Sequence, residues 1–176
     1  MKIYISAFGN NASAVAAMDQ YRMDYMAKME EFTRKLAYLG RRVIVRIISP
    51  HRFNGDTENN LKVEPLIRKR GHAWVLTTTS AGILYLEFGS GVRNIGNQNP
   101  KAAEHDMGPG TNSPKGHWND EGGWFYPTDD DRLIVFRDKN GQGYGHTYGT
   151  RPVMPFYNAE KEIMENVVTI AQEVWG

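Results

Sequence analysis

The chain of 176 residues is 40% hydrophobic, has a formal net charge of +1 and contains no cysteine. This length favours one domain, and the near-neutral charge argues against a protein whose main task is to bind nucleic acid through a strongly basic surface. Without cysteine, disulfides, thiolate catalysis and cysteine zinc sites are excluded. No apolar run approaches the ~18 residues of a membrane span, and residues 3–8 are too few for a signal-peptide core, so we expect a soluble protein made in the cytoplasm.

Basic residues cluster at two places. The first cluster is Arg41, Arg42 and Arg46, and the second is the run 68–70. The ordinary interpretation of such clusters is a solvated face. The low net charge still leaves room for a local basic patch.

A helical pattern begins near Ser13, after N-cap candidates at Asn10 and Asn11. Apolar residues then repeat at alternating steps of three and four residues, with Arg22 as the polar interruption. They are Met18, Tyr25, Met29, Phe32, Leu36 and Leu39. We expect a helix over residues 13–39, about 40 Å long, that packs against the core or a partner subunit. Gly40 is one possible end. Residues 41–49 are compatible with a strand or with a helix that continues to Pro50, and we favour the helix.

The next apolar runs predict strands over residues 61–68, 73–79 and 83–88, joined as an antiparallel meander. Residues 92–123 are rich in Gly, Asn and Pro and lack periodicity. We expect an excursion, about residues 93–123, that orders mainly against partners. The runs GWFYPT and RLIVFRD predict two further strands, with a hairpin turn at residues 139–141.

A second helix is expected from Pro155, which suits a first helical position. Its apolar stripe is Phe156, Ala159, Ile163, Val167, Ile170 and Val174. The predicted fold is therefore α+β in a single domain, residues 1–176. An antiparallel sheet is packed by a long N-terminal and a C-terminal helix, and the sheet carries the Gly/Pro-rich excursion.

The sequence offers little evidence for a metal-binding or phosphate-binding site. The five histidines, His51, His72, His105, His117 and His146, are scattered. His105-Asp106 and His117 with Asp120 offer ligands, but none has the spacing of a zinc protease. Residues 129–131 are acidic without the spacing of a calcium loop, which favours a charged turn. GQGYG lacks the Lys-Ser/Thr of a phosphate loop. We predict no catalytic residue, metal or cofactor.

The run ILYLEFGSG, residues 83–91, places Glu87 at the end of an apolar segment, before Gly89 and Gly91. A nuclease would use such a carboxylate with a second one, and no second carboxylate stands at a matching strand end. A structural role is the better interpretation. Glu87 would accept hydrogen bonds from loop amides or pair with Arg151, and the glycines would permit a left-handed turn into the excursion.

Five motifs occur in order: LAYLG (36–40), NGD (54–56), LYLEFGSGV (84–92), GWFY (123–126) and RPVMPFYNAEKEI (151–163). Together they resemble a family of small tail-component proteins of long-tailed bacteriophages, also described as neck, tail-completion or head–tail joining proteins. The resemblance runs from Phe32 to the end of the chain. The matching positions are Glu87, Phe88, Gly89, Gly91, Pro152, Pro155, Phe156 and Ala159.

This resemblance implies a non-enzymatic α+β subunit that assembles as a ring, often a hexamer, at the head–tail junction of the virion. Its partners would be copies of itself and the neighbouring head-completion or connector and tail proteins. DNA would pass only transiently, no membrane would be involved, and assembly would occur in the host cytoplasm. None of the matching positions has a catalytic role in that family.

Three alternatives stay open. A tail terminator that caps the tail tube would share this fold and ring geometry. A metal-dependent DNA-processing enzyme would use Glu87 and histidines of the excursion. A small toxin-like or host-binding module would use the aromatic residues of the excursion.

Overall fold

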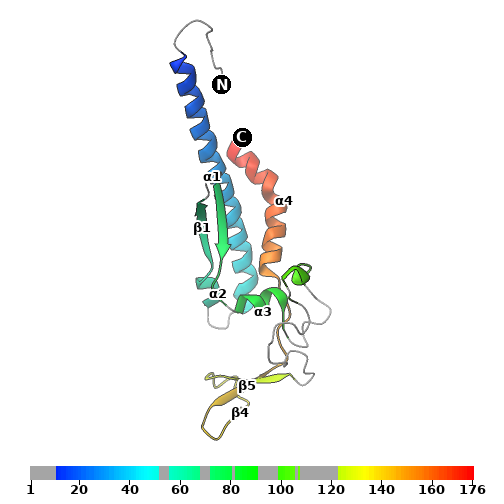
Figure 1. Ribbon diagram of the computed structural model, residues 1–176. Helices are drawn as coiled ribbons and strands as arrows, with labels where there is room; N and C mark the ends of the chain where they lie inside the picture. Colours follow the sequence, from blue (N-terminus) through cyan, green and yellow to red (C-terminus); the bar gives the residue numbers. More distant parts are fainter. Residues whose placement is uncertain are drawn as a thin grey trace.

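The computed structural model describes residues 11–51, 56–67, 72–80, 82–90, 99–105, 107 and 123–176. It contains helices and two small antiparallel sheets, so the α+β prediction is confirmed, although the strands form two sheets rather than one. Figure 1 shows a long helical spine with a second helix and a hairpin beside it and the other sheet at the far end. The elements are α1 (Ala12–Ile48), η1 (Ser49–His51), α2 (Asp56–Asn59), β1 (Lys62–Ile67), β2 (His72–Thr77), α3 (Gly82–Phe88), η3 (Ala102–His105), β3 (Trp124–Pro127), β4 (Phe136–Arg137), β5 (Gly143–Thr147) and α4 (Pro155–Trp175).

Helix α1 runs for 37 residues and passes through Gly40 without a break. The helical interpretation of residues 41–49 is therefore confirmed. The β-branched residues of this part are helical because they form the centre of the core. Val43 and Ile44 are 2% and 1% exposed, and such burial outweighs their weak helix propensity. The α-helix ends just before Pro50, which lacks the amide that a further turn would need.

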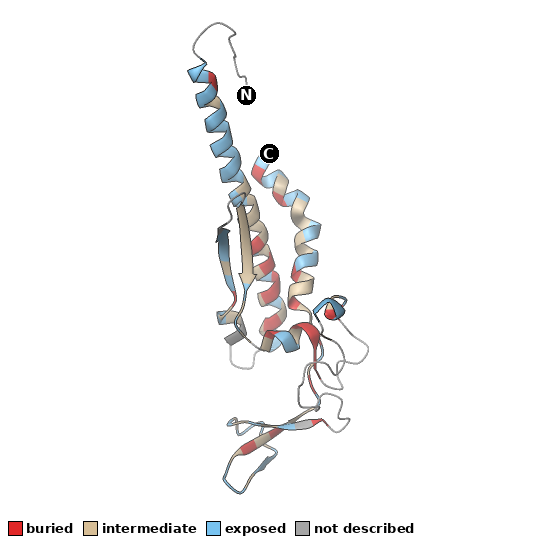
Figure 2. Cartoon of the chain, in the orientation of Figure 1, coloured by how far each residue is buried: buried red, intermediate tan, exposed pale blue. Residues whose placement is uncertain are grey.

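The core lies where the second half of α1 meets α3, α4 and the chain before β1. Its buried members are Val43, Ile44, Ile48, Leu61, Ile83 and Ala159, with Leu39, Leu76, Leu86 and Phe156 packed around them. Figure 2 shows this burial concentrated in the half of α1 that lies beside α4. The first half of α1 contributes almost nothing to the core.

At Gly40, side chains of β2 and α4 closely approach the backbone of α1. A Cβ atom there would lie 2.8 Å from Leu76 Cδ1 and 2.9 Å from Ile163 Cδ1. The glycine therefore lets a strand and a helix pack directly against the α1 backbone.

We expect Gly40→Leu to lower the free energy of unfolding by about 1–3 kcal/mol, because the new side chain overpacks this contact. Gly40→Ala should be nearly neutral, since about 1 kcal/mol of helix propensity offsets small shifts of two flexible side-chain ends. Urea unfolding followed by circular dichroism measures both. Ala27→Leu, on an exposed turn of the same helix, is the control. A Gly40→Leu protein as stable as that control would contradict the close approach.

The predicted meander is only partly correct. β1 and β2 pair antiparallel, with Lys62 opposite Thr77 and Ile67 opposite His72. The third predicted strand is wrong, because residues 82–88 form helix α3. A short apolar run does not distinguish a buried strand from a buried helix by periodicity. Here Ile83 and Glu87, one helical turn apart, are buried while Leu84 and Tyr85 are exposed.

The second sheet has the order β3-β5-β4 and is antiparallel throughout. The two strands predicted in 123–138 and the turn at 139–141 are present, with Gly141 at φ +85°. β5 is an addition to the prediction. Gly145 is buried in it, and a Cβ atom there would lie 2.7 Å from Tyr126 Cζ. The glycines of GQGYG thus allow other side chains to cross the strand.

Candidate functional site

Glu87 stands at the end of α3 beside the start of α4, and both carboxylate oxygens accept hydrogen bonds. The backbone N–H of Phe156 donates to Oε2 at 2.7 Å, and that of Tyr157 donates to Oε1 at 3.0 Å. Asn99 Nδ2 donates to Oε1 at 2.6 Å. The Glu87 residue is 7% exposed. We call this group of Glu87, Asn99, Phe156 and Tyr157 the Glu87 junction.

The junction supplies a cap that α4 lacks in its own sequence. The first amides of a helix have no partner within it. Met154, at the N-cap position, makes no side-chain cap and adopts a left-handed conformation, φ 55° and ψ 54°. Pro155 at the first position has no N–H to satisfy. The Glu87 carboxylate therefore satisfies the next two amides and also meets the positive end of the helix dipole.

Backbone pairing holds the two motifs together around this carboxylate. Val153 N and Met154 N both donate to Leu86 O, at 2.8 and 3.1 Å. Ser90 and Thr150 exchange backbone hydrogen bonds at 2.8 and 3.1 Å. Gly89 turns the chain at φ +74°, the left-handed turn that was expected there. The LEFGSG and TRPVMPF segments, about sixty residues apart, thus form one structural unit.

The root of the excursion packs against this unit. Asn99 and Ala102 are buried, and His105 lies 5.6 Å from Phe88 between ring centroids. Lys101 forms an ion pair with Glu160, and this hydrogen bond raises the pKa of the lysine. The expectation that the excursion orders mainly against partners is therefore wrong for residues 99–105, which pack on their own chain.

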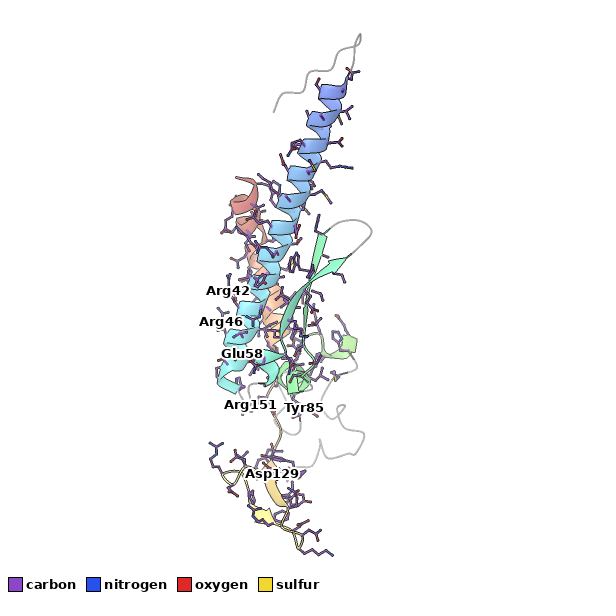
Figure 3. All side chains as sticks on the ribbon, turned by 90° about the vertical axis from the view of Figure 1, so that its left-hand side faces the viewer. Arg42, Arg46, Glu58, Tyr85, Asp129 and Arg151 are labelled. Carbon is purple, nitrogen blue, oxygen red and sulfur yellow. The ribbon has the colours of Figure 1, made fainter. Side chains whose placement is uncertain are left out.

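The predicted motif residues differ in their burial and in their contacts. Among the described residues, no ion pair joins Arg151 to Glu87, and Arg151 is exposed (Figure 3). The pairing predicted between them is therefore wrong, because two helix amides and an asparagine already surround the carboxylate. Phe88, Gly89, Pro152, Pro155 and Ala159 are buried, and Phe156 is half-buried. Gly91 lies outside the described residues.

A different kind of surface occupies the first half of α1. Apart from Ala14 and Ala17, every residue from 12 to 28 is exposed. The exposed apolar side chains are Val15, Met18, Tyr21, Met23, Tyr25 and Met26. Figure 1 shows α1 extending beyond the end of α4, where Trp175 packs on Phe32 with ring centroids 5.1 Å apart. We call residues 12–31 the exposed α1 segment.

The predicted apolar stripe of α1 is therefore divided. Its lower part, Phe32, Leu36 and Leu39, is half-buried, and its upper members Met18 and Tyr25 are 57% and 46% exposed. The stripe continues beyond α4 into the exposed α1 segment.

The three-stranded sheet of β3, β5 and β4 carries a row of aromatic rings on one face. Register places Phe125 opposite His146 and Phe136 opposite Tyr144, so their side chains share a face. Phe125 and Phe136 lie 5.2 Å apart between centroids, and Phe136 and Tyr144 lie 5.1 Å apart. Tyr148 extends the row, 4.8 Å from His146. Phe125, Phe136 and Tyr148 are exposed. This aromatic face, Phe125, Phe136, Tyr144, His146 and Tyr148, was not predicted, although the two-residue spacing from 144 to 148 was a usable signal.

The acidic turn beside this face is held by arginines. Arg132 donates to both oxygens of Asp130, at 2.9 and 2.7 Å, and this hydrogen bonding lowers the pKa of the Asp130 carboxyl. Arg137 pairs with Asp131 at 2.6 Å. Two of the three carboxylates considered for calcium are therefore engaged by arginine, as expected for a charged turn.

No group of three or more His, Asp or Glu residues in the described parts of the chain is arranged to hold a metal ion. His105 packs on Phe88 and His146 belongs to the aromatic face. Asp106, His117 and Asp120 lie outside the described residues. Within the same described ranges, no helix has the length and apolarity needed to cross a membrane.

Comparison with known proteins gives no assignment: no family model, curated protein or solved structure matches the chain. The molecule is characterised by its fold and by the features above, the Glu87 junction, the exposed α1 segment and the aromatic face.

Proposed function

We propose that this chain is a structural subunit of the neck of a long-tailed bacteriophage, which completes the tail and joins it to the head as part of an oligomeric ring. The observation that carries the proposal is the exposed α1 segment. It is about 30 Å long at 1.5 Å per residue, and helices in proteins owe most of their stability to the packing of an apolar face, which this segment lacks within the subunit. Its six exposed large apolar side chains are the kind of surface through which proteins associate.

That the assembly is a phage neck is inferred from the motif resemblance, and the Glu87 junction supports that resemblance. The two most characteristic motifs, around Glu87 and around Pro155, were recognised separately. They meet through hydrogen bonds from Phe156 and Tyr157. Motifs that match by chance have no reason to lie in contact across sixty-nine residues of chain.

The elongated shape suits a ring subunit with neighbours on several sides. The exposed α1 segment and the aromatic face lie at opposite ends of the molecule (Figure 1). A closed ring buries different patches on the two sides of each subunit. We assign the exposed α1 segment to contacts with copies of the same chain. We assign the aromatic face to a neighbouring connector or tail protein. DNA would pass the ring transiently within the virion.

The alternative of a metal-dependent nuclease is less well supported. Both oxygens of Glu87 already accept hydrogen bonds that serve the fold, and the described parts of the chain place no group of three or more His, Asp or Glu residues where it could hold a metal ion.

Electron microscopy of lysates from phage that lack this protein tests the proposal. We expect full heads beside separate tails of normal length. Abnormally long tails would move the assignment to a tail terminator, which the same subunit design permits. Normal infectious particles would overturn both assignments.

A further inference from the structure

A groove of about 390 Å³ with a mixed polar and apolar lining runs between α1 and α4, away from the Glu87 junction. From α1 it is lined by Arg34, Lys35, Tyr38 and Arg42. From α4, Asn166, Thr169 and Glu173 complete its polar lining, and Leu39 and Ile170 form the apolar part. The volume is that of a small-ligand site.

The α1 side of this groove is strongly basic. Residues 33–48 contain five Arg or Lys residues and no Asp or Glu. Arg34, Tyr38, Arg42 and Arg46 follow one another at four-residue steps and therefore share a face. Figure 3 shows Arg42 and Arg46 one turn apart on that face. This is one of the clusters that the sequence offered as an ordinary solvated surface.

Acidic residues neutralise only part of this charge. Glu162 pairs with Arg46 at 2.6 Å, and Glu173 pairs with Lys35 at 3.2 Å. Glu31 also approaches Lys35, at 3.5 Å. Within the described part of the chain, Arg34 and Arg42 have neither an ion pair nor a side-chain hydrogen bond. The groove thus holds two guanidinium groups whose donors are unused.

We propose that this groove binds a ligand carrying two or more phosphate groups, and that Arg34 and Arg42 are the contacting residues. A guanidinium presents a planar fork of donors that matches phosphate oxygens. The two arginines are eight residues apart, about 12 Å along the helix, which is too far for one phosphate to engage both closely. The hydroxyls of Tyr38 and Thr169, which also line the groove, add further donors.

Two sources supply such a ligand: the backbone of nucleic acid and a small polyphosphate. The low net charge means that binding would depend on this groove and not on a general basic surface. The inference does not rest on the proposed function, because the site belongs to one subunit whatever that subunit assembles into.

The test is fluorescence anisotropy of a labelled duplex DNA with the full chain at low salt, about 50 mM. Unlabelled duplex, sodium tripolyphosphate and polyglutamate serve as competitors. The variant is Arg34→Gln with Arg42→Gln, and the control is Arg132→Gln, an exposed arginine paired with Asp130 in the turn between β3 and β4. Thermal unfolding checks that all three proteins fold.

We expect the wild type and the control to bind, and the double variant to bind about tenfold or more weakly. A plot of the logarithm of the binding constant against the logarithm of the salt concentration should become shallower for the double variant. Its slope should change by about one unit for each phosphate that the variant no longer contacts. Displacement by unlabelled duplex alone identifies a nucleic-acid backbone as the ligand, and displacement by tripolyphosphate at similar phosphate concentration identifies a small polyphosphate. If the duplex does not bind, a rise in the unfolding temperature with tripolyphosphate that the double variant lacks identifies a small polyphosphate as the ligand. Neither duplex binding nor such a rise, equal binding by the double variant, or equal competition by polyglutamate would overturn the phosphate site.

Discussion

Glu87→Gln is expected to lower the free energy of unfolding by about 2–3 kcal/mol. The glutamine keeps one acceptor oxygen and replaces the other with an amide group that only donates. One helix amide, from Phe156 or Tyr157, would then face a donor in a buried site. The start of α4 would also lose the negative charge that stabilises its dipole.

Urea unfolding followed by circular dichroism measures this effect, and Glu165→Gln is the matched control. Glu165 is exposed on the same helix, so the same exchange there should change stability by no more than about 0.5 kcal/mol. Reduced particle assembly should accompany the loss of stability, because the junction ties the excursion root to α4. A Glu87→Gln protein that folded and assembled like the control would remove the structural role proposed for this carboxylate.

Long periodic elements were predictable from the sequence, and short ones were not. The stripes of α1 and α4 repeat over many turns, so their helical character is evident before any packing is known. Residues 83–88 contain too few positions to separate a strand from a helix. Tertiary contacts determine that this segment is a helix, because Ile83 and Glu87, one turn apart, are both buried.

Prediction of the junction was limited in a similar way. The motif identified Glu87 as structural, and its placement before Gly89 was informative. Its partners were not predictable, because a carboxylate is satisfied equally by an arginine or by backbone amides. Arg151 was the visible candidate, yet Asn99 and the amides of α4 provide the contacts. Nothing in the local sequence of Asn99 marks it as a buried donor.

Met18→Lys combined with Tyr25→Lys should abolish the joining of heads to tails while leaving the subunit folded. Both side chains are exposed in the subunit, so their replacement should change its stability by no more than about 0.5 kcal/mol each. In the ring they would be buried. Burial of a large apolar side chain contributes about 1.5–3 kcal/mol, and an unpaired lysine adds a further cost. A loss of about 3 kcal/mol at each subunit interface weakens it more than a hundredfold.

Complementation of phage lacking the chain, with joined particles counted by electron microscopy, measures this loss, and urea unfolding checks the subunit. The matched control is Met164→Lys with Val168→Lys, two exposed apolar residues on α4. Only the α1 variant should fail to join heads to tails. Its two residues belong to the apolar stripe of α1, which α4 covers only in the second half of that helix. Failure of the α4 variant alone would transfer the subunit interface to α4. If the α1 variant joined heads to tails as often as the wild type, Met18 and Tyr25 would have no role in assembly and the prediction would be wrong.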